Sequence, residues 1–151
     1  MRIQNKCGSC TLCCEILPIP EIQKPENVLC SKCTKNQGCN IYSNRPKSCK
    51  DFRCLFIETD MVQELRPDKC NIIFEKITET VYIGTRQKDN LENWNSVPVK
   101  KYMKSLNEKG ISIILSSFTH TPKLFILANG KTKEEIFARA MVEYNKYYKN
   151  K

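Results

Sequence analysis

The sequence predicts an α+β fold in which a cysteine-rich N-terminal head packs on a small antiparallel sheet with helices. One observation is that nine of the ten cysteines fall between Cys7 and Cys54, in a region without strong apolar periodicity. Another is that residues 57–151 carry strand-like and helix-like patterns in turn. The length of 151 residues suits one domain. We therefore expect a head, residues 1–56, packed with a body, residues 57–151, as a single compact domain.

The head is expected to contain little regular structure. Prolines at positions 18, 20 and 25 predict an extended crossing, because proline fixes φ and disfavours a helical residue before it. The stretch NRPKSCKDFRCLFIE predicts one short helix, with Pro46 in its first turn and Cys49 close behind. A segment of this composition buries too little apolar surface to fold alone, so an additional constraint is required.

The body begins with a predicted β-hairpin over residues 71–87, in which side chains alternate and the tripeptide TET forms the turn. A helix is predicted over residues 97–110, with Gly110 at its C-terminal end. Two apolar runs, residues 111–118 and 123–130, predict buried strands joined by the turn THTP. These elements would form the small antiparallel sheet and its first covering helix.

The body closes with a predicted helix over residues 132–149. Thr132 and Glu135 have the spacing of a capping box, which supplies hydrogen-bond partners at a helix N-terminus. One face of this helix carries an apolar stripe that should pack on the sheet. The stripe consists of Ile136, Phe137, Ala140, Met141 and Tyr144. The single histidine, His120, falls in the THTP turn and is expected at the surface.

The location expected from the sequence is the cytoplasm. No apolar run approaches the roughly eighteen residues that a membrane-spanning helix needs, so no membrane association is expected. The first residues, MRIQNKCGSC, lack the apolar core of a secretory signal. In a reducing compartment, clustered cysteines are better explained as metal ligands or catalytic groups than as disulfides.

The cysteine spacings indicate metal ligation. Cys7-x2-Cys10 and Cys30-x2-Cys33 are separated by residues 11–29, a spacing typical of zinc ribbons. Soft thiolates select zinc or iron–sulfur clusters over hard cations. Further cysteines remain at positions 13, 14, 39, 49 and 54. The candidate metal ligands are Cys7, Cys10, Cys13, Cys14, Cys30, Cys33, Cys39 and Cys49, with Cys54 in reserve.

The adjacent pair Cys13-Cys14 indicates more than one centre. Neighbouring side chains point about 100° apart in a helix and to opposite sides in a strand, so two adjacent cysteines are poorly placed to bind one ion. We therefore expect Cys13 and Cys14 to serve different metal centres, or one of them not to be a ligand. Cys70 stands apart from the cluster and is expected to be a buried small side chain.

The net charge of +9 is spread along the chain, and the part in residues 1–56 is best explained by the same cluster. Deprotonated cysteines would be strongly anionic even with metal bound, and nearby cations would stabilise them and lower their pKa values. Arg45 is expected to donate hydrogen bonds to carbonyl groups or to face the cluster. Because the basic residues are expected to offset the thiolate charge, nucleic acid is a disfavoured partner. The basic residues expected to offset the thiolates are Arg2, Lys6, Lys32, Lys47, Lys50 and Arg53.

The segments CGSCTLCC, CSKC and GCNIYSNRPKSCKDFRC closely resemble the CxxCxxCC cysteine-cluster family, also called the YkgJ family. The shared features are an N-terminal CxxCxxCC, a middle cysteine pair and a block that runs here from Cys39 through Ile41, Tyr42, Arg45 and Pro46 to Cys49. The resemblance covers residues 7–56. Its members are described as zinc- or iron-chelating proteins, so the resemblance implies a metal-binding cluster here.

One branch of that family resembles the flagellin lysine methyltransferases, which are thought to use an iron–sulfur cluster. This chain has no glycine-rich nucleotide loop and no Cys-x3-Cys-x2-Cys signature. The expected function is therefore zinc chelation at more than one centre. An iron site or 4Fe-4S cluster with a redox or enzymatic, methyltransferase-like role is the alternative, and the sequence leaves an enzymatic role open. Metal ions are the expected partners, and a protein or peptide partner is compatible with this interpretation.

Overall fold

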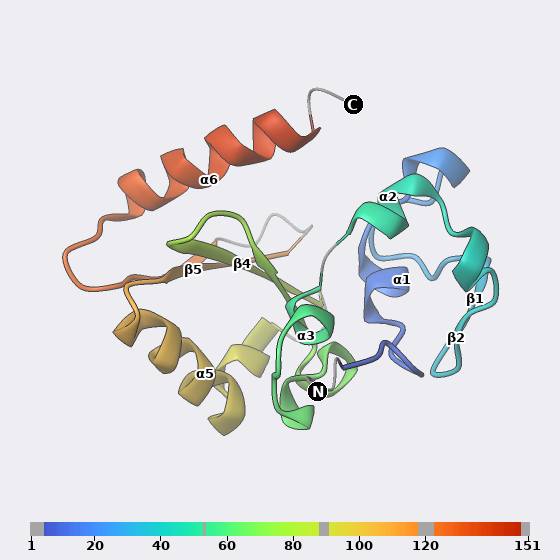
Figure 1. The fold of residues 1–151 in the computed structure, drawn as a ribbon, viewed down its shortest axis with the longest axis horizontal. Coiled ribbons are helices and arrows are strands. Elements are labelled where there is room, and N and C mark those ends of the chain that lie inside the picture. Colours follow the sequence, from blue (N-terminus) through green and yellow to red (C-terminus); the bar gives the residue numbers. More distant parts are fainter. Residues whose placement is uncertain (1–4, 53, 88–90, 118–122, 149–151) are drawn as a thin grey trace.

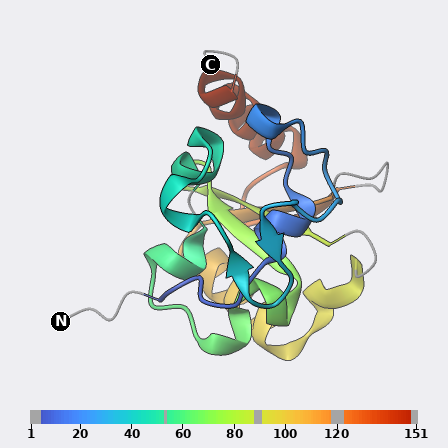
Figure 2. The ribbon, with the colours of Figure 1, turned by 90° about the vertical axis from the view of Figure 1, so that its right-hand side faces the viewer.

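A four-stranded sheet forms the centre of the body, with helices on both of its faces (Figure 1). The computed structural model describes residues 5–52, 54–87, 91–117 and 123–148. The cysteine-rich head lies beside the sheet, next to its first strand (Figures 1 and 2). The α+β class predicted from the sequence is confirmed.

The sheet is mixed rather than wholly antiparallel. Its strands are β3 (Ile72–Lys76), β4 (Val81–Arg86), β5 (Ser112–Ser116) and β6 (Leu124–Ile126), in that spatial order. The β3–β4 hairpin and the β5–β6 pair are antiparallel, as expected, whereas β4 and β5 are parallel. The connection explains the difference. A 3-10 turn, η4 (Leu91–Asn95), and helix α5 (Val97–Glu108) lead the chain back to the end of the sheet where β4 began.

The two faces of the sheet are buried in different clusters. Phe74, Gly84 and Leu115 are in register on the face that packs against α5. Glycine is required there by space, since a Cβ on Gly84 would lie 2.6 Å from the Cδ2 of Leu115. On the opposite face, Ile114 packs with Ile136 of the last helix, α6 (Lys133–Tyr148). Both faces are therefore closed by a helix, one above and one below the sheet (Figure 1).

Helix α6 begins with one of the two hydrogen bonds of the predicted capping box, while the Glu135 carboxylate pairs with Lys131 and Arg139. The N–H of Glu135 donates to the Oγ1 of Thr132 at 3.2 Å. Its apolar stripe packs along one side only: Ile136 and Ala140 are buried, whereas Phe137 and Met141 are each 37% exposed. The side chain of Tyr144, the predicted THTP turn and His120 lie outside the described residues.

The head consists of short elements joined by turns. They are α1 (Leu12–Ile16), η1 (Pro20–Ile22), β1 (Cys33–Thr34), β2 (Gly38–Cys39), η2 (Tyr42–Asn44), α2 (Lys47–Asp51) and α3 (Leu55–Glu58), followed in the body by η3 (Gln63–Leu65) and α4 (Pro67–Cys70). The single helix predicted after Pro46 is in fact two, α2 and α3. The chain becomes extended at Phe52, with φ −68° and ψ 128°, and ends α2 there.

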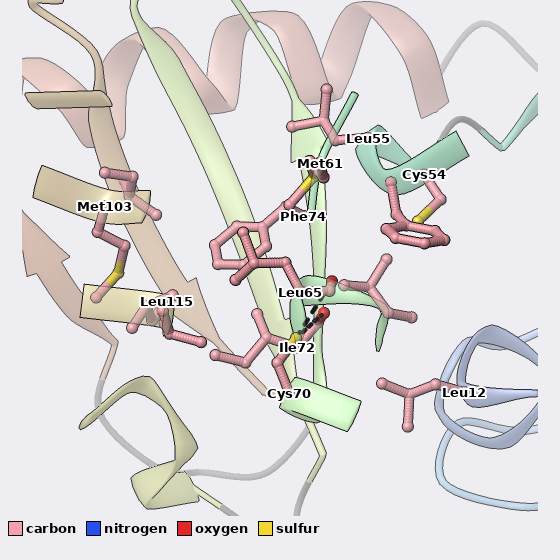
Figure 3. Close-up of a cluster of buried hydrophobic side chains, with 14 of the residues drawn as sticks. Leu12, Cys54, Leu55, Met61, Leu65, Cys70, Ile72, Phe74, Met103 and Leu115 are labelled. Atoms are coloured by element: carbon pink, nitrogen blue, oxygen red, sulfur yellow. Dashed lines mark hydrogen bonds between the residues drawn. The ribbon is translucent and has the colours of Figure 1, made fainter. Parts of the chain in front are cut away.

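One buried core joins the head to the body (Figure 3). Leu12 of the head lies in the same cluster as Phe74 of the sheet. Cys70, at the end of α4, is also in this core and only 5% exposed. Its thiol donates to the carbonyl oxygens of Leu65 and Ile72, at 3.5 and 3.3 Å. The interpretation of Cys70 as a buried small side chain is confirmed.

No helix within the described ranges combines the length and the apolar character that crossing a membrane requires.

Candidate metal centre

Helix α1 directs its two adjacent cysteines into different surroundings. Cys13 packs against the core that the head shares with the body. Cys14 packs instead with a small separate cluster around Ile19, Cys30 and Cys33. Successive side chains of a helix point about 100° apart, which allows neighbours in sequence to face different ways. The two residues therefore pack in different clusters, while their thiols stay within hydrogen-bonding distance of each other. The remaining cysteines fall into two groups around them, and service of two metal centres stays a prediction.

The first cysteine group consists of Cys7, Cys10, Cys13 and Cys54. Cys7 and Cys10 are joined by a turn, in which the N–H of Cys10 donates to the carbonyl oxygen of Cys7 at 3.0 Å. Gly8 within this turn has φ +54°, a conformation that other residues rarely adopt. Cys54 precedes α3, and burial raises the pKa of its thiol to about 12, with Cys7 and Cys10 adding to the shift. The thiols of two distant segments therefore share one environment.

The second cysteine group consists of Cys14, Cys30, Cys33, Cys39 and Cys49. The N–H of Cys30 donates to the carbonyl oxygen of Cys14 at 3.0 Å, and the N–H of Cys33 donates to that of Cys30 at 3.0 Å. The CSKC segment thus closes the same kind of turn as CGSC. Cys33 pairs with Cys39 across the β1–β2 hairpin. Cys49, in the first turn of α2, packs against the same cluster.

The Cys13 thiol connects the two groups. Its hydrogen bond lowers the pKa of Cys7 to about 7, against the opposing effect of burial. It also lowers the pKa of Cys14 to about 6, with a further contribution from a hydrogen bond to Cys33. The same interactions raise the pKa of Cys13 well above its ordinary value. Thiols on both sides of α1 are therefore close enough to exchange hydrogen bonds through this one side chain.

Lys24 supplies a buried positive charge to the second group. It is 7% exposed, and its Nζ donates to the carbonyl oxygens of Leu17 and of Pro25, the latter at 3.0 Å. Burial lowers the pKa of Lys24, and the nearby thiols of Cys30 and Cys14 oppose that shift. Lys24 is in turn one of the groups that lower the pKa of Cys14. A lysine so enclosed favours thiolates beside it.

Two arginines place positive charge near the first group and favour its thiolates. Arg45 and Arg66 both contribute to the lowered pKa of Cys7, after the larger effect of Cys13. Arg45 lies over the ring of Tyr42, with its Cζ 3.8 Å from the ring centroid. Its Nε is buried without a hydrogen-bond partner among the described residues. Such a donor favours an anionic group in its surroundings.

Sequence reasoning missed Lys24, because proline-rich stretches predict an extended chain. Ile19 and Lys24 instead pair with each other across a tight turn, in which Gln23 has φ +52°. This turn returns the lysine to the cysteines. The residues expected to offset the charge were different. Of these, Arg2 and Arg53 lie outside the described residues, and Lys6, Lys32, Lys47 and Lys50 are exposed.

A further contact ties the hairpin to α1. The hydroxyl of Thr11, which is fully buried, donates to the Oε1 of Glu15 at 2.8 Å and accepts from the N–H of Asn36 at 3.4 Å. Lys35 forms an ion pair with Glu15 at 3.2 Å. Two consecutive residues of the hairpin turn are thus fixed to the helix that carries Cys13 and Cys14.

The nine predicted ligand residues are all brought into these two groups. Cys54, the reserve ligand, joins the first group. Cys10 lies in the core shared with the body, whereas Cys30 and Cys33 lie in the separate small cluster, so the packing favours other partners than the zinc-ribbon pairing that their spacing suggests.

The thiols are grouped but do not already converge on one point. Across the described parts of the chain, no three or more Cys, His, Asp or Glu side chains are arranged to hold a single ion. All ten cysteines are free, and several are packed as small apolar side chains. To ligate an ion, the thiols of a group would lose their protons and rotate toward one another. The lowered pKa values of Cys7 and Cys14 favour this, whereas burial raises the pKa values of Cys10, Cys33 and Cys54 and opposes it.

Comparison of the chain with protein-family models, with curated proteins and with solved structures finds no match. The resemblance of residues 7–56 to the CxxCxxCC family therefore stays a prediction from the motif. Function is inferred below from the chemistry of the two cysteine groups.

Proposed function

We propose that this protein is a cytoplasmic metal-binding protein whose head chelates zinc, with one centre in each cysteine group. Cys7, Cys10, Cys13 and Cys54 would hold one ion. Four of the five cysteines of the second group would hold the other. The proposal agrees with the resemblance to the CxxCxxCC family, whose motif supplies eight of these nine residues. A protein or peptide that docks on the metal-loaded head is compatible with it.

The observation that carries the proposal is the grouping of cysteines from separate segments around one short helix. Thiols from the N-terminal turn, α1, the CSKC turn, the β1–β2 hairpin, α2 and the start of α3 form just two groups. Within its described residues, the head has no helix or strand longer than five residues to stabilise it, and metal ligation is a common solution for such segments. Lys24 and the two arginines offset the charge that thiolates would bring.

The number of thiols favours zinc. Zinc in structural sites takes four ligands in a tetrahedral shell, and the first group supplies four cysteines. The second group supplies five, so it can fill the same shell with one thiol in excess. Zinc also needs no assembly chemistry, whereas an iron–sulfur cluster must be built and inserted.

The experiment that tests the proposal is anaerobic purification of the full chain, followed by elemental analysis and optical spectroscopy. We expect a colourless protein with about two zinc ions per chain, and loss of cooperative unfolding when a chelator removes them. A protein that carries no metal after anaerobic purification, and gains none on incubation with zinc, would contradict the proposal.

The same measurement distinguishes zinc from the alternative, an iron–sulfur cluster. Clustered thiolates also bind iron–sulfur clusters, and cysteine spacings of two residues suit them. Brown protein with iron and sulfide in place of zinc would indicate the redox or enzymatic role. Aerobic purification alone is a poor test, because zinc can replace lost iron.

A further inference from the structure

We propose that Cys33 and Cys39 form a reversible disulfide under peroxide stress, and that this disulfide releases the metal of the second cysteine group. The pair is an oxidation site. Hydrogen peroxide would oxidise its two thiols to a disulfide, and a small dithiol reductant would reduce the disulfide again. The disulfide follows from the hairpin geometry alone. The release of metal rests on the proposed function.

The hairpin fixes the two cysteines opposite each other. The register pairs Cys33 with Cys39 and Thr34 with Gly38. The N–H of Asn40 donates to the carbonyl oxygen of Lys32 at 2.8 Å, so Lys32 and Asn40 form a hydrogen-bonded pair. Hydrogen-bonded and non-hydrogen-bonded pairs alternate along antiparallel strands. Cys33 and Cys39 are therefore a non-hydrogen-bonded pair, in which the side chains are closest.

This position matches the geometry of a disulfide. The Cα atoms of a non-hydrogen-bonded antiparallel pair are about 4.5 Å apart, and both side chains leave the same face. Disulfides require Cα atoms between about 4.4 and 6.8 Å apart. The backbone of the hairpin therefore does not have to move. The turn at Lys35 and Asn36 is held to α1 through Glu15 and Thr11, which keeps the strands in register.

The competing pairs are less well placed. Cys13 and Cys14 are adjacent, and a disulfide between neighbours strains the peptide that joins them. Cys14 does exchange a hydrogen bond with Cys33, but it lies on α1 rather than on a paired strand. The two cysteines of the CSKC turn are held by the bond from the Cys33 N–H to the Cys30 carbonyl. Only Cys39 faces Cys33 across a ladder.

The reaction begins at the more accessible thiol. Cys39 is half-buried, whereas Cys33 is 8% exposed, so peroxide reaches Cys39 first. The Cys39 thiolate attacks one peroxide oxygen, which breaks the O–O bond and gives a sulfenic acid and water. The Cys33 sulfur then displaces the sulfenic oxygen as a second water. Two thiols lose two protons and two electrons, and peroxide takes both, so the balance is two thiols and hydrogen peroxide to one disulfide and two waters.

Metal release follows from the ligand count. The second group has five thiols, and a disulfide removes two of them at once. Three remain, which cannot complete the four-sulfur shell of structural zinc. The first group shares neither residue, so its ion should stay bound. Oxidation would therefore reduce the zinc content by one ion per chain.

The experiment is peroxide treatment of the full chain, metal-free and zinc-loaded in parallel, with alkylation, digestion and mass spectrometry of the cross-linked peptides. We expect a Cys33–Cys39 cross-link as the main product, loss of alkylation at both residues, and reversal by dithiothreitol. The variant Cys39→Ser should form no cross-link to Cys33. The variant Cys49→Ser, which removes another half-buried thiol of the same group, should still form it.

The two proposals fail in different ways. A predominant Cys14–Cys33 or Cys30–Cys33 cross-link, or irreversible oxidation of Cys39 without a partner, would overturn this inference whether or not zinc binds. A Cys33–Cys39 cross-link in a protein that binds no zinc would sustain the disulfide and overturn the proposed function together with the release step. Zinc that stays fully bound after the cross-link forms would overturn the release step alone.

Discussion

Gly38 packs so closely against Gly8 that a Cβ on Gly38 would lie 3.1 Å from the Gly8 carbonyl oxygen. Gly8 belongs to the turn that joins Cys7 and Cys10, and Gly38 immediately precedes Cys39. This backbone contact therefore connects the first cysteine group with the hairpin of the second. Gly38 also has φ +118°, which other residues rarely adopt.

The variant Gly38→Ala should be destabilised more than Gly130→Ala. Gly130 has φ +74°, and a Cβ there would meet no atom within 4 Å, so its substitution carries only the backbone cost. At Gly38 the methyl group also meets the Gly8 carbonyl, which should add about 1 kcal/mol. Urea unfolding of both variants measures the difference. Equal losses would mean that the Gly8–Gly38 contact relaxes without cost.

The variants Cys13→Ser and Cys14→Ser should affect different zinc ions. Cys13→Ser leaves three thiols in the first group, which should lose its ion, whereas Cys14→Ser leaves four in the second group, which should bind its ion more weakly. In Cys13→Ser, alkylation of the zinc-incubated protein should label Cys7, Cys10 and Cys54 and spare the second group. In Cys14→Ser the labelled residues should be those of the second group. The control is Cys70→Ala, which should keep both ions because Cys70 lies in the apolar core. Identical labelling in the two serine variants would contradict the division of α1 between two centres.

Removal of the Lys24 charge should weaken zinc binding at the second group. Lys24→Met leaves the neighbouring thiolates without their buried cation. The attraction between one unit charge and a nearby thiolate contributes on the order of 1–2 kcal/mol to the binding free energy. Competition with a zinc chelator should therefore show roughly tenfold weaker binding for one of the two ions. Lys50→Met, which removes an exposed cation next to Cys49, should bind zinc as the unaltered chain does. If Lys24→Arg binds zinc as tightly as the unaltered chain, the loss of affinity in Lys24→Met is due to the charge.

Glu75 should make the fold less stable as the pH rises. Burial raises the pKa of Glu75 to about 7, from an ordinary value of 4.5. In the register, Glu75 lies beside Ile83 and Ile114, on the sheet face that α6 covers. The folded chain therefore holds this proton more tightly than the unfolded chain. The stabilisation by the protonated form is complete below pH 4.5, declines above it and is lost once the pH passes about 7.

The variant Glu75→Gln should remove this contribution. Because the amide stays neutral, the variant should be more stable than the unaltered chain near pH 8, by on the order of 2 kcal/mol. Near pH 4.5 the two should differ little. Glu134→Gln, at an exposed position in the first turn of α6, should leave the pH profile of unfolding unchanged. Because Glu75→Gln and the unaltered chain contain the same cysteines, the difference between their pH profiles of unfolding reports Glu75 alone.

Local patterns predicted the body well, because each element there is determined by residues near in sequence. The β3–β4 hairpin, α5 and the Thr132 cap of α6 follow from alternation, from Gly110 and from Thr132 itself. The parallel pairing of β4 with β5 could not be predicted in this way. It depends on where α5 returns the chain, and the same strand sequences would serve an antiparallel neighbour equally well.

The candidate site was predicted at the level of residue type but not of partners. The packing of Cys13 and Cys14 in different clusters followed from helical geometry, since it depends on two adjacent residues alone. The separation of Cys7 and Cys10 from Cys30 and Cys33 did not, because equal spacing says nothing about which turns meet. These groupings are decided by long-range contacts such as the hydrogen bond between Asn36 and Thr11.

The position of Cys13 and Cys14 on one short helix has a consequence for metal loading. Their Cα atoms are only about 3.8 Å apart, as in any pair of successive residues. Reorientation of α1 to suit an ion on one side necessarily displaces the sulfur on the other. In the proposed function, the affinity of each centre would depend on whether its neighbour is filled, and by thermodynamic linkage the dependence would be mutual. Zinc uptake by this head would then be two coupled binding reactions rather than two independent ones.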